Sequence, residues 1–169
     1  RNAIGRTGAS QLLGQVEAGY SFGIYEPAAA TVTPFARLQA MSISQSAFSE
    51  TGASSLSLNV AQQTTSSVRT VIGAELASRI EMGWREKLAL QFRVGWAHEY
   101  ADTSRPVTAA FAGAPTIGYT VYGAAPERNT ATVGLAASTA IAEATSVYFR
   151  YDGEAGSGTD NHVVSAGLR

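Results

Sequence analysis

Hydrophobic and polar residues alternate along residues 87–97, which read KLALQFRVGWA. Side chains on a β-strand point to its two faces in turn, so one face of this segment would be apolar. The apolar set is Leu88, Leu90, Phe92, Val94 and Trp96, and the opposite set is Lys87, Ala89, Gln91, Arg93, Gly95 and Ala97. Repeated along a chain, this pattern is typical of a transmembrane β-barrel, which is apolar toward lipid and polar toward its interior.

The same alternation recurs in seven more segments, with turn residues between them. These segments are residues 15–24, 32–40, 68–76, 117–121, 131–138, 147–152 and 164–168. No window keeps an apolar stripe at helical spacing. The pattern predicts an all-β fold, an antiparallel up-and-down meander of about eight strands that forms one transmembrane β-barrel domain over residues 1–169. Antiparallel pairing is favoured because short turns cannot make the long crossovers that parallel strands need.

Connections of two kinds separate the predicted strands. Tight turns are predicted at residues 84–86 and 143–144, and longer loops at 102–115 and 153–161. Residues 44–67 are rich in Ser, Thr, Gln and Gly, with a short alternating piece at Leu56, Leu58 and Val60. This stretch predicts either a long rim loop or an extension of the flanking strands.

Eight charged residues fall on the polar faces of the predicted strands. An Arg or Lys that faced lipid at the midplane of a barrel would cost about 2–4 kcal/mol. The alternation therefore predicts that these side chains face the interior of the barrel, where they can pair or meet water. They are Glu17, Arg37, Arg69, Glu75, Arg93, Glu99, Arg150 and Asp152. Because Glu75 and Arg93 lie on neighbouring predicted strands, we expect them to form an ion pair.

Composition narrows the possible functions. The 169 residues carry a net charge of −1, so no strong positive field predicts a nucleic-acid partner. Cysteine is absent, and no apolar run approaches the length of a transmembrane helix. Charged residues make up 15% of the chain, against roughly 25% in soluble domains. A soluble β-sandwich or ligand-binding β-barrel stays open as an alternative, because strand alternation by itself also occurs in such folds.

Candidate chemistry is sparse. The two histidines, His98 and His162, lie in no metal-ligand spacing. The acidic residues Asp152, Glu154 and Asp160 do not follow the EF-hand pattern. No nucleophile elbow, phosphate-binding loop or dinucleotide fingerprint is present. The sequence therefore predicts a protein that is not an enzyme, with no catalytic residue, no cofactor and no metal.

Several short segments form a series along the chain. They are TPFARLQ at 33–39, FSETGA at 48–53, VRTVIGAE at 68–75, GWAHEY at 95–100, FAG at 111–113, VYGA at 121–124, YFRYDGE at 148–154 and HVVSAGLR at 162–169. Together they resemble the C-terminal portion of the autotransporter β-domain, the translocator of type V secretion. The resemblance implies a barrel in the outer membrane of a Gram-negative bacterium that exports an N-terminal passenger and anchors it to the cell surface. It also implies three partners: outer-membrane lipid, the passenger segment, which lies outside this chain, and the barrel-assembly machinery.

The chain departs from the family pattern in three ways. The family barrel has twelve strands, it is preceded by a helix that threads the pore, and it ends in an aromatic residue. This sequence predicts eight strands and ends at Arg169. We therefore expect a fragment truncated at both ends. A self-contained eight-stranded outer-membrane protein that serves adhesion stays open as an alternative.

Overall fold

The computed structural model describes residues 2–81, 87–142, 145–158 and 160–169. Within these ranges the only helices are two 3-10 turns, η1 (Glu26–Ala28) and η2 (Ser54–Leu56). No helix among the described residues is long and apolar enough to cross a membrane. The predicted all-β fold is confirmed.

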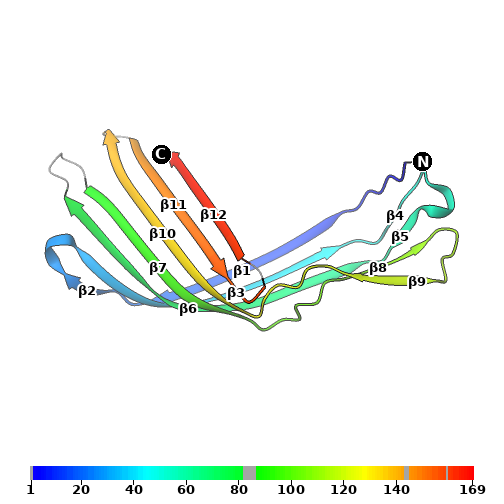
Figure 1. The fold of residues 1–169 in the computed structure, drawn as a ribbon, viewed down its shortest axis with the longest axis horizontal. Helices are drawn as coiled ribbons and strands as arrows, with labels where there is room; N and C mark the ends of the chain where they lie inside the picture. The colour runs from blue at the N-terminus through cyan, green and yellow to red at the C-terminus, as the bar shows by residue number, and fades with distance from the viewer. Residues whose placement is uncertain (1, 82–86, 143–144, 159) are drawn as a thin grey trace. The chain divides into compact units, whose positions relative to one another are not determined.

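The larger of two sheets has eight strands (Figure 1). Along the sheet their order is β1-β3-β6-β7-β10-β11-β12, and β2 pairs with β3. The ladders β2–β3, β6–β7, β7–β10, β10–β11 and β11–β12 are antiparallel, as predicted. The strands are β1 (Ala9–Gly19), β2 (Phe22–Tyr25), β3 (Ala30–Gln45), β6 (Gln63–Glu81), β7 (Lys87–Glu99), β10 (Asn129–Ala142), β11 (Thr145–Ala155) and β12 (Asp160–Leu168).

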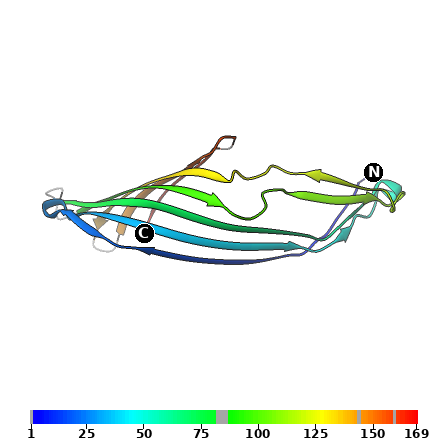
Figure 2. The same cartoon turned by 90° about the horizontal axis from the view of Figure 1, so that it is seen from below.

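A second, four-stranded sheet corrects two of the predictions. Its antiparallel order is β4 (Phe48–Ser49), β5 (Leu58–Val60), β8 (Pro106–Phe111) and β9 (Gly118–Tyr122). The predicted loop at 102–115 is wrong, because β8 lies within it. The predicted strand at 117–121 exists as β9, but it pairs with β8 beside it (Figure 2) and not with the larger sheet. The short connection from β8 to β9 favours this local hairpin, and β10 takes the place beside β7.

Strand limits also differ from those predicted. β3 reaches Gln45 and β6 begins at Gln63, so the second option for residues 44–67, extension of the flanking strands, is the correct one. Leu56 lies in η2 and not in a strand. The predicted strand at 15–24 is interrupted, because β1 ends at Gly19 and β2 begins three residues later. β11 and β12 extend into the predicted loop at 153–161, and the turns predicted at 84–86 and 143–144 lie outside the described residues.

The chain forms two compact units. Unit 1 comprises residues 1–14, 39–68 and 100–126, and unit 2 comprises 15–38, 69–99 and 127–169. Unit 1 contains the four-stranded sheet. Its buried residues are Ala53, Ser57 and Ala109, and the Ser57 hydroxyl accepts a hydrogen bond from the Ala53 N–H at 3.2 Å.

The buried cluster of unit 2 is small. It comprises Phe35, Val71 and Ala97, which are 6%, 6% and 1% exposed. The ladders β6–β7 and β7–β10 keep one register throughout their length. Because a shift of one residue would exchange the two faces of a strand, this continuity keeps the apolar and charged sets on opposite sides.

Two glycines on neighbouring strands pair with each other, and the Phe35 ring lies close to one of them. Gly73 on β6 pairs with Gly95 on β7. A Cβ atom on Gly73 would clash with the carbonyl oxygen of Val94 and would lie 2.8 Å from Cζ of Phe35. A side chain at position 73 would therefore force backbone and ring apart, so glycine is required there by close approach.

We expect Gly73→Ala to lower the unfolding free energy of the chain in detergent by about 1–3 kcal/mol, the usual cost of overpacking. Thermal unfolding followed by circular dichroism measures the change. Gly23→Ala is the matched control, because no atom lies within 4 Å of the position its Cβ would take. Equal stability of the two variants would contradict the close packing at Gly73.

Candidate functional site

Strand register brings charged residues of unit 2 to one face of the larger sheet. Glu75 lies opposite Arg93, and Arg69 lies opposite Glu99, on the β6–β7 ladder. Gly134 on β10 pairs with Arg93 on one side and with Asp152 on the other, so these positions share a face. The residues predicted to line an interior are distributed over five strands: Glu17 on β1, Arg37 on β3, Arg69 and Glu75 on β6, Arg93 and Glu99 on β7, and Arg150 and Asp152 on β11.

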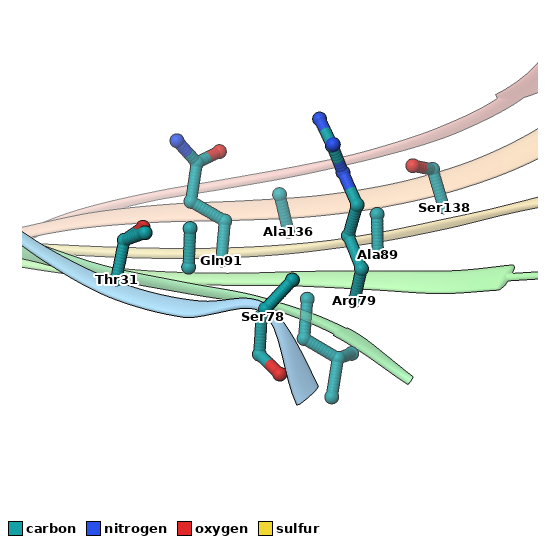
Figure 3. A pocket seen from close by; sticks show the side chains of 10 residues that line it. Thr31, Ser78, Arg79, Ala89, Gln91, Ala136 and Ser138 are labelled. Atoms are coloured by element: carbon teal, nitrogen blue, oxygen red, sulfur yellow. The ribbon is translucent and has the colours of Figure 1, made fainter. Parts of the chain in front are cut away.

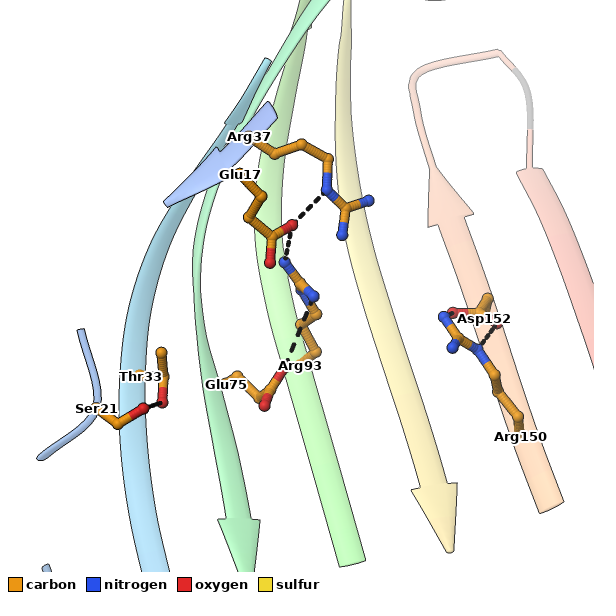
Figure 4. A network of polar contacts seen from close by, with 8 residues as sticks. All are labelled: Glu17, Ser21, Thr33, Arg37, Glu75, Arg93, Arg150 and Asp152. Carbon is orange, nitrogen blue, oxygen red and sulfur yellow. Dashed lines mark hydrogen bonds and ion pairs between the residues drawn. The ribbon is translucent and has the colours of Figure 1, made fainter. Parts of the chain in front are cut away.

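Four of these residues meet in one group, which we call the Arg93 cluster (Figure 4). Oε2 of Glu17 lies 2.6 Å from Nε of Arg37 and 2.8 Å from Nη2 of Arg93. Oε2 of Glu75 lies 3.6 Å from Nη1 of Arg93. Two carboxylates thus balance two guanidinium groups, and the cluster is neutral.

Arg93 is held from a further side by an aromatic ring. Its Cζ atom lies 3.6 Å from the ring centroid of Phe35, which is a cation–π contact. Nη2 of Arg93 is buried and makes no well-aligned hydrogen bond within the described residues, so its attraction to Glu17 is chiefly Coulombic. Phe35 was not among the predicted site residues. It could have been found from the alternation, because it shares the odd-numbered face of its strand with Arg37.

The Glu17–Arg93 contact shows that this face of unit 2 is concave. β1 and β7 are separated by β3 and β6, so they lie three strand intervals apart. Three intervals in a flat sheet span about 14 Å, and side chains that stand roughly perpendicular to the sheet cannot bridge that distance. The side chains meet because the sheet curves toward them. The sequence pattern predicts the pair of Arg93 with Glu75 but not the contact with Glu17, because alternation gives the face of a residue but not the curvature of the sheet.

A second ion pair crosses the concave face in the same manner. Nη2 of Arg69 on β6 lies 2.9 Å from Oε1 of Glu154 on β11, again three strand intervals away. The same nitrogen donates to Oγ1 of Thr130 at 2.9 Å. The loop predicted at 153–161 includes Glu154, but this residue lies on β11 and continues the alternation of Arg150 and Asp152.

The last pair lies within one strand. Nε of Arg150 is 2.6 Å from Oδ2 of Asp152, and Nη2 of Arg150 is 2.8 Å from Oδ1 of the same residue. The two side chains are 59% and 44% exposed, so this pair is the most open of those on the face. Glu99, in contrast, is only 7% exposed.

The geometry offers little for bond-making chemistry. No group of three or more His, Asp or Glu side chains in the described ranges could hold a metal ion. Nδ1 of His98 lies 2.7 Å from Oδ1 of Asn129, and Nδ1 of His162 lies 2.8 Å from the Tyr151 hydroxyl oxygen. What the face does present is a fixed pattern of paired charges on a concave wall, which suits contact with water and polar polypeptide.

A family model of the autotransporter β-domain matches residues 1–152. The chain belongs to the autotransporter β-domain family. The resemblance seen in the sequence is therefore confirmed. Autotransporter β-domains are translocator barrels of the outer membrane and are in general not enzymes. No curated protein sequence matches the chain.

The opposite face of this autotransporter β-domain is apolar and uncovered. Ile72 is 67% exposed and Trp96 is 56% exposed. The chain has 11550 Å² of accessible surface, whereas a folded soluble monomer of its 17.6 kDa mass has about 7,900 Å². Exposed large apolar groups on one face and paired charges on the concave face reverse the usual order of a soluble protein, and they suit the outer-membrane insertion that the family implies.

We expect the coupling between Arg93 and Glu17 to exceed that between Arg93 and Glu75, because the charged atoms are 2.8 Å apart in the first pair and 3.6 Å in the second. A double-mutant cycle with Glu17→Gln and Arg93→Gln should give about 1 kcal/mol of coupling, because the pair is only partly exposed. The second cycle uses Glu75→Gln. Urea unfolding in detergent measures both, and additivity in the first cycle would show that Glu17 and Arg93 do not interact.

We expect Arg69→Gln to cost about 1–2 kcal/mol of unfolding free energy, because it breaks a hydrogen bond and an ion pair that hold distant strands together. Arg150→Gln is the matched control and should change stability by about 0.5 kcal/mol or less, because its pair is open to solvent. The same urea titration compares the two. A larger loss from Arg150→Gln would mean that the cross-face pair does not support the curvature.

Proposed function

We propose that this autotransporter β-domain exports an N-terminal passenger across the outer membrane and anchors it to the cell surface. The observation that supports this proposal is the contrast between its faces in unit 2: an uncovered apolar face and a concave face of paired charges. The apolar face contacts lipid. The concave face lines the passage through which the passenger moves.

Pairing of the interior charges suits a wall that a polypeptide must pass without being retained. An unpaired charge binds groups of opposite sign, and it would hold acidic or basic segments in transit. In the Arg93 cluster each guanidinium already has a carboxylate partner, so the wall is polar and wettable yet nearly neutral. The contacts that cross three strand intervals also keep the wall curved while the chain moves along it.

Two further partners follow from the membrane setting. Outer-membrane lipid covers the large apolar residues, whose exposure to water would otherwise be unfavourable. The hydrogen-bonded order of the larger sheet begins at β1 and ends at β12. Because backbone groups at a sheet edge need partners in lipid, we propose that the barrel-assembly machinery receives these edge strands during insertion.

The test places an epitope ahead of Arg1 in the gene that encodes this chain and expresses the gene in a Gram-negative host. We expect the protein in the outer-membrane fraction and the epitope on intact cells, where added protease removes it. Leu90→Arg puts a charge on the apolar face and should reduce insertion, because lipid-facing arginine costs about 2–4 kcal/mol. Gln91→Arg is the control, since that residue lies on the opposite face. An epitope that stays protected in intact cells would refute export.

A further inference from the structure

A bay of about 310 Å³ opens on the concave face of unit 2, and none of its lining residues belongs to the Arg93 cluster (Figure 3). Its polar walls include Arg79 on β6 and Gln91 on β7. Ala89 on β7 lies opposite Arg79, and Ala136 on β10 lies opposite Gln91. Figure 3 shows that Arg79 and Gln91 rise from the same side of the sheet, whereas Ser78 points to the other side. The alanines leave the space between the long side chains open. We call this feature the Arg79 bay.

Arg79 is the exception to charge pairing on this face. The guanidinium groups of Arg37, Arg69, Arg93 and Arg150 each have a carboxylate partner. Within the described residues Arg79 has none, and its cross-strand neighbour on β7 is an alanine. Of the remaining acidic residues of the face, Glu81 and Glu99 are engaged in interactions of their own. The bay therefore carries a guanidinium group that forms no ion pair with any acidic residue in the described part of unit 2.

We propose that the Arg79 bay binds a carboxylate side chain of the polypeptide segment that occupies the interior, an inference that rests on the proposed export function. A guanidinium group recognises a carboxylate through two parallel hydrogen bonds. The amide of Gln91 and the hydroxyl groups of Thr31 and Ser138 supply donors and acceptors for the adjoining backbone. One positive charge matches a carboxylate, whereas a phosphate monoester carries about −1.5 to −2 and would stay undercompensated.

The ligand must be part of a chain and not a free acid. One ion pair that is open to water contributes roughly 0–1 kcal/mol, which cannot offset the entropy that a free molecule loses on binding. A carboxylate on a segment already held in the passage is present at high effective concentration and needs no such compensation. The Arg79 bay is thus a site that acts on a tethered ligand and fixes its position along the wall.

Disulfide tethering tests the proposal, because the chain has no cysteine of its own. The folded Ala89→Cys protein in detergent is equilibrated, in a glutathione buffer, with two short thiol peptides that differ only by Glu in place of Gln. Mass spectrometry measures the fraction of each mixed disulfide. We expect the Glu peptide to be favoured roughly two- to fivefold, as one water-exposed ion pair allows.

Three controls make the result decisive. Adding Arg79→Gln should abolish the preference, and Arg79→Lys should keep part of it. Ser78→Cys, on the opposite side of the sheet, should show none. Equal capture of the two peptides at Ala89→Cys, or a preference that survives Arg79→Gln, would overturn the proposal. Loss of the preference in millimolar acetate would also overturn it, by showing a site for free small acids.

The outcome is independent of the export test. A Glu preference with a protected epitope would leave the bay in place and refute export. A surface-exposed epitope with no Glu preference would leave the export function in place and refute the bay.

Discussion

Curvature of the larger sheet within unit 2 is the constraint on which its other features depend. Glu17 reaches Arg93, and Arg69 reaches Glu154, only because strands three intervals apart turn their inner faces toward each other. Curvature crowds side chains on the concave face, so some positions there must be small. The facing glycines of β6 and β7 meet this need, and the Phe35 ring lies close to Gly73. The same bending spreads the apolar side chains of the convex face and leaves them uncovered.

The two units of this chain contain different kinds of β-structure. Unit 2 uses mostly long strands whose faces differ sharply in polarity, and its β6–β7 and β7–β10 ladders keep one register throughout. Unit 1 uses short strands in a four-stranded sheet, with few buried residues and a local hairpin of β8 and β9. Short paired strands of this type stabilise loops without requiring a large core, because each ladder satisfies its own backbone groups.

Alternation along the chain was sufficient to predict the all-β fold class and the relative faces of the residues within 68–76, 87–97, 131–138 and 147–152. It also predicted that Glu75 and Arg93 are neighbours on adjacent strands. Alternation puts both residues on the same face, and the order of the strands along the chain puts them opposite each other. It could not predict the contact of Arg93 with Glu17, which depends on curvature. It also missed β8, a strand of six residues that begins with Pro106, since a segment so short and proline-led has the same pattern as a loop. Which strands become neighbours across long connections is a tertiary property, so the pairing of β10 with β7 lay beyond the sequence pattern.

The unbroken register of β7 also limits how its gene can change. Deletion of one codon inside this strand would move the following side chains of the strand to the other face, so its apolar side chains would lie on the concave, charged face. Correcting the error would require a compensating insertion in the same strand. The connection between β8 and β9 carries no such restriction, because a residue gained there alters only the tip of a hairpin. Insertions and deletions should therefore accumulate among relatives in the connections of unit 1, while the membrane strands diverge by substitution alone.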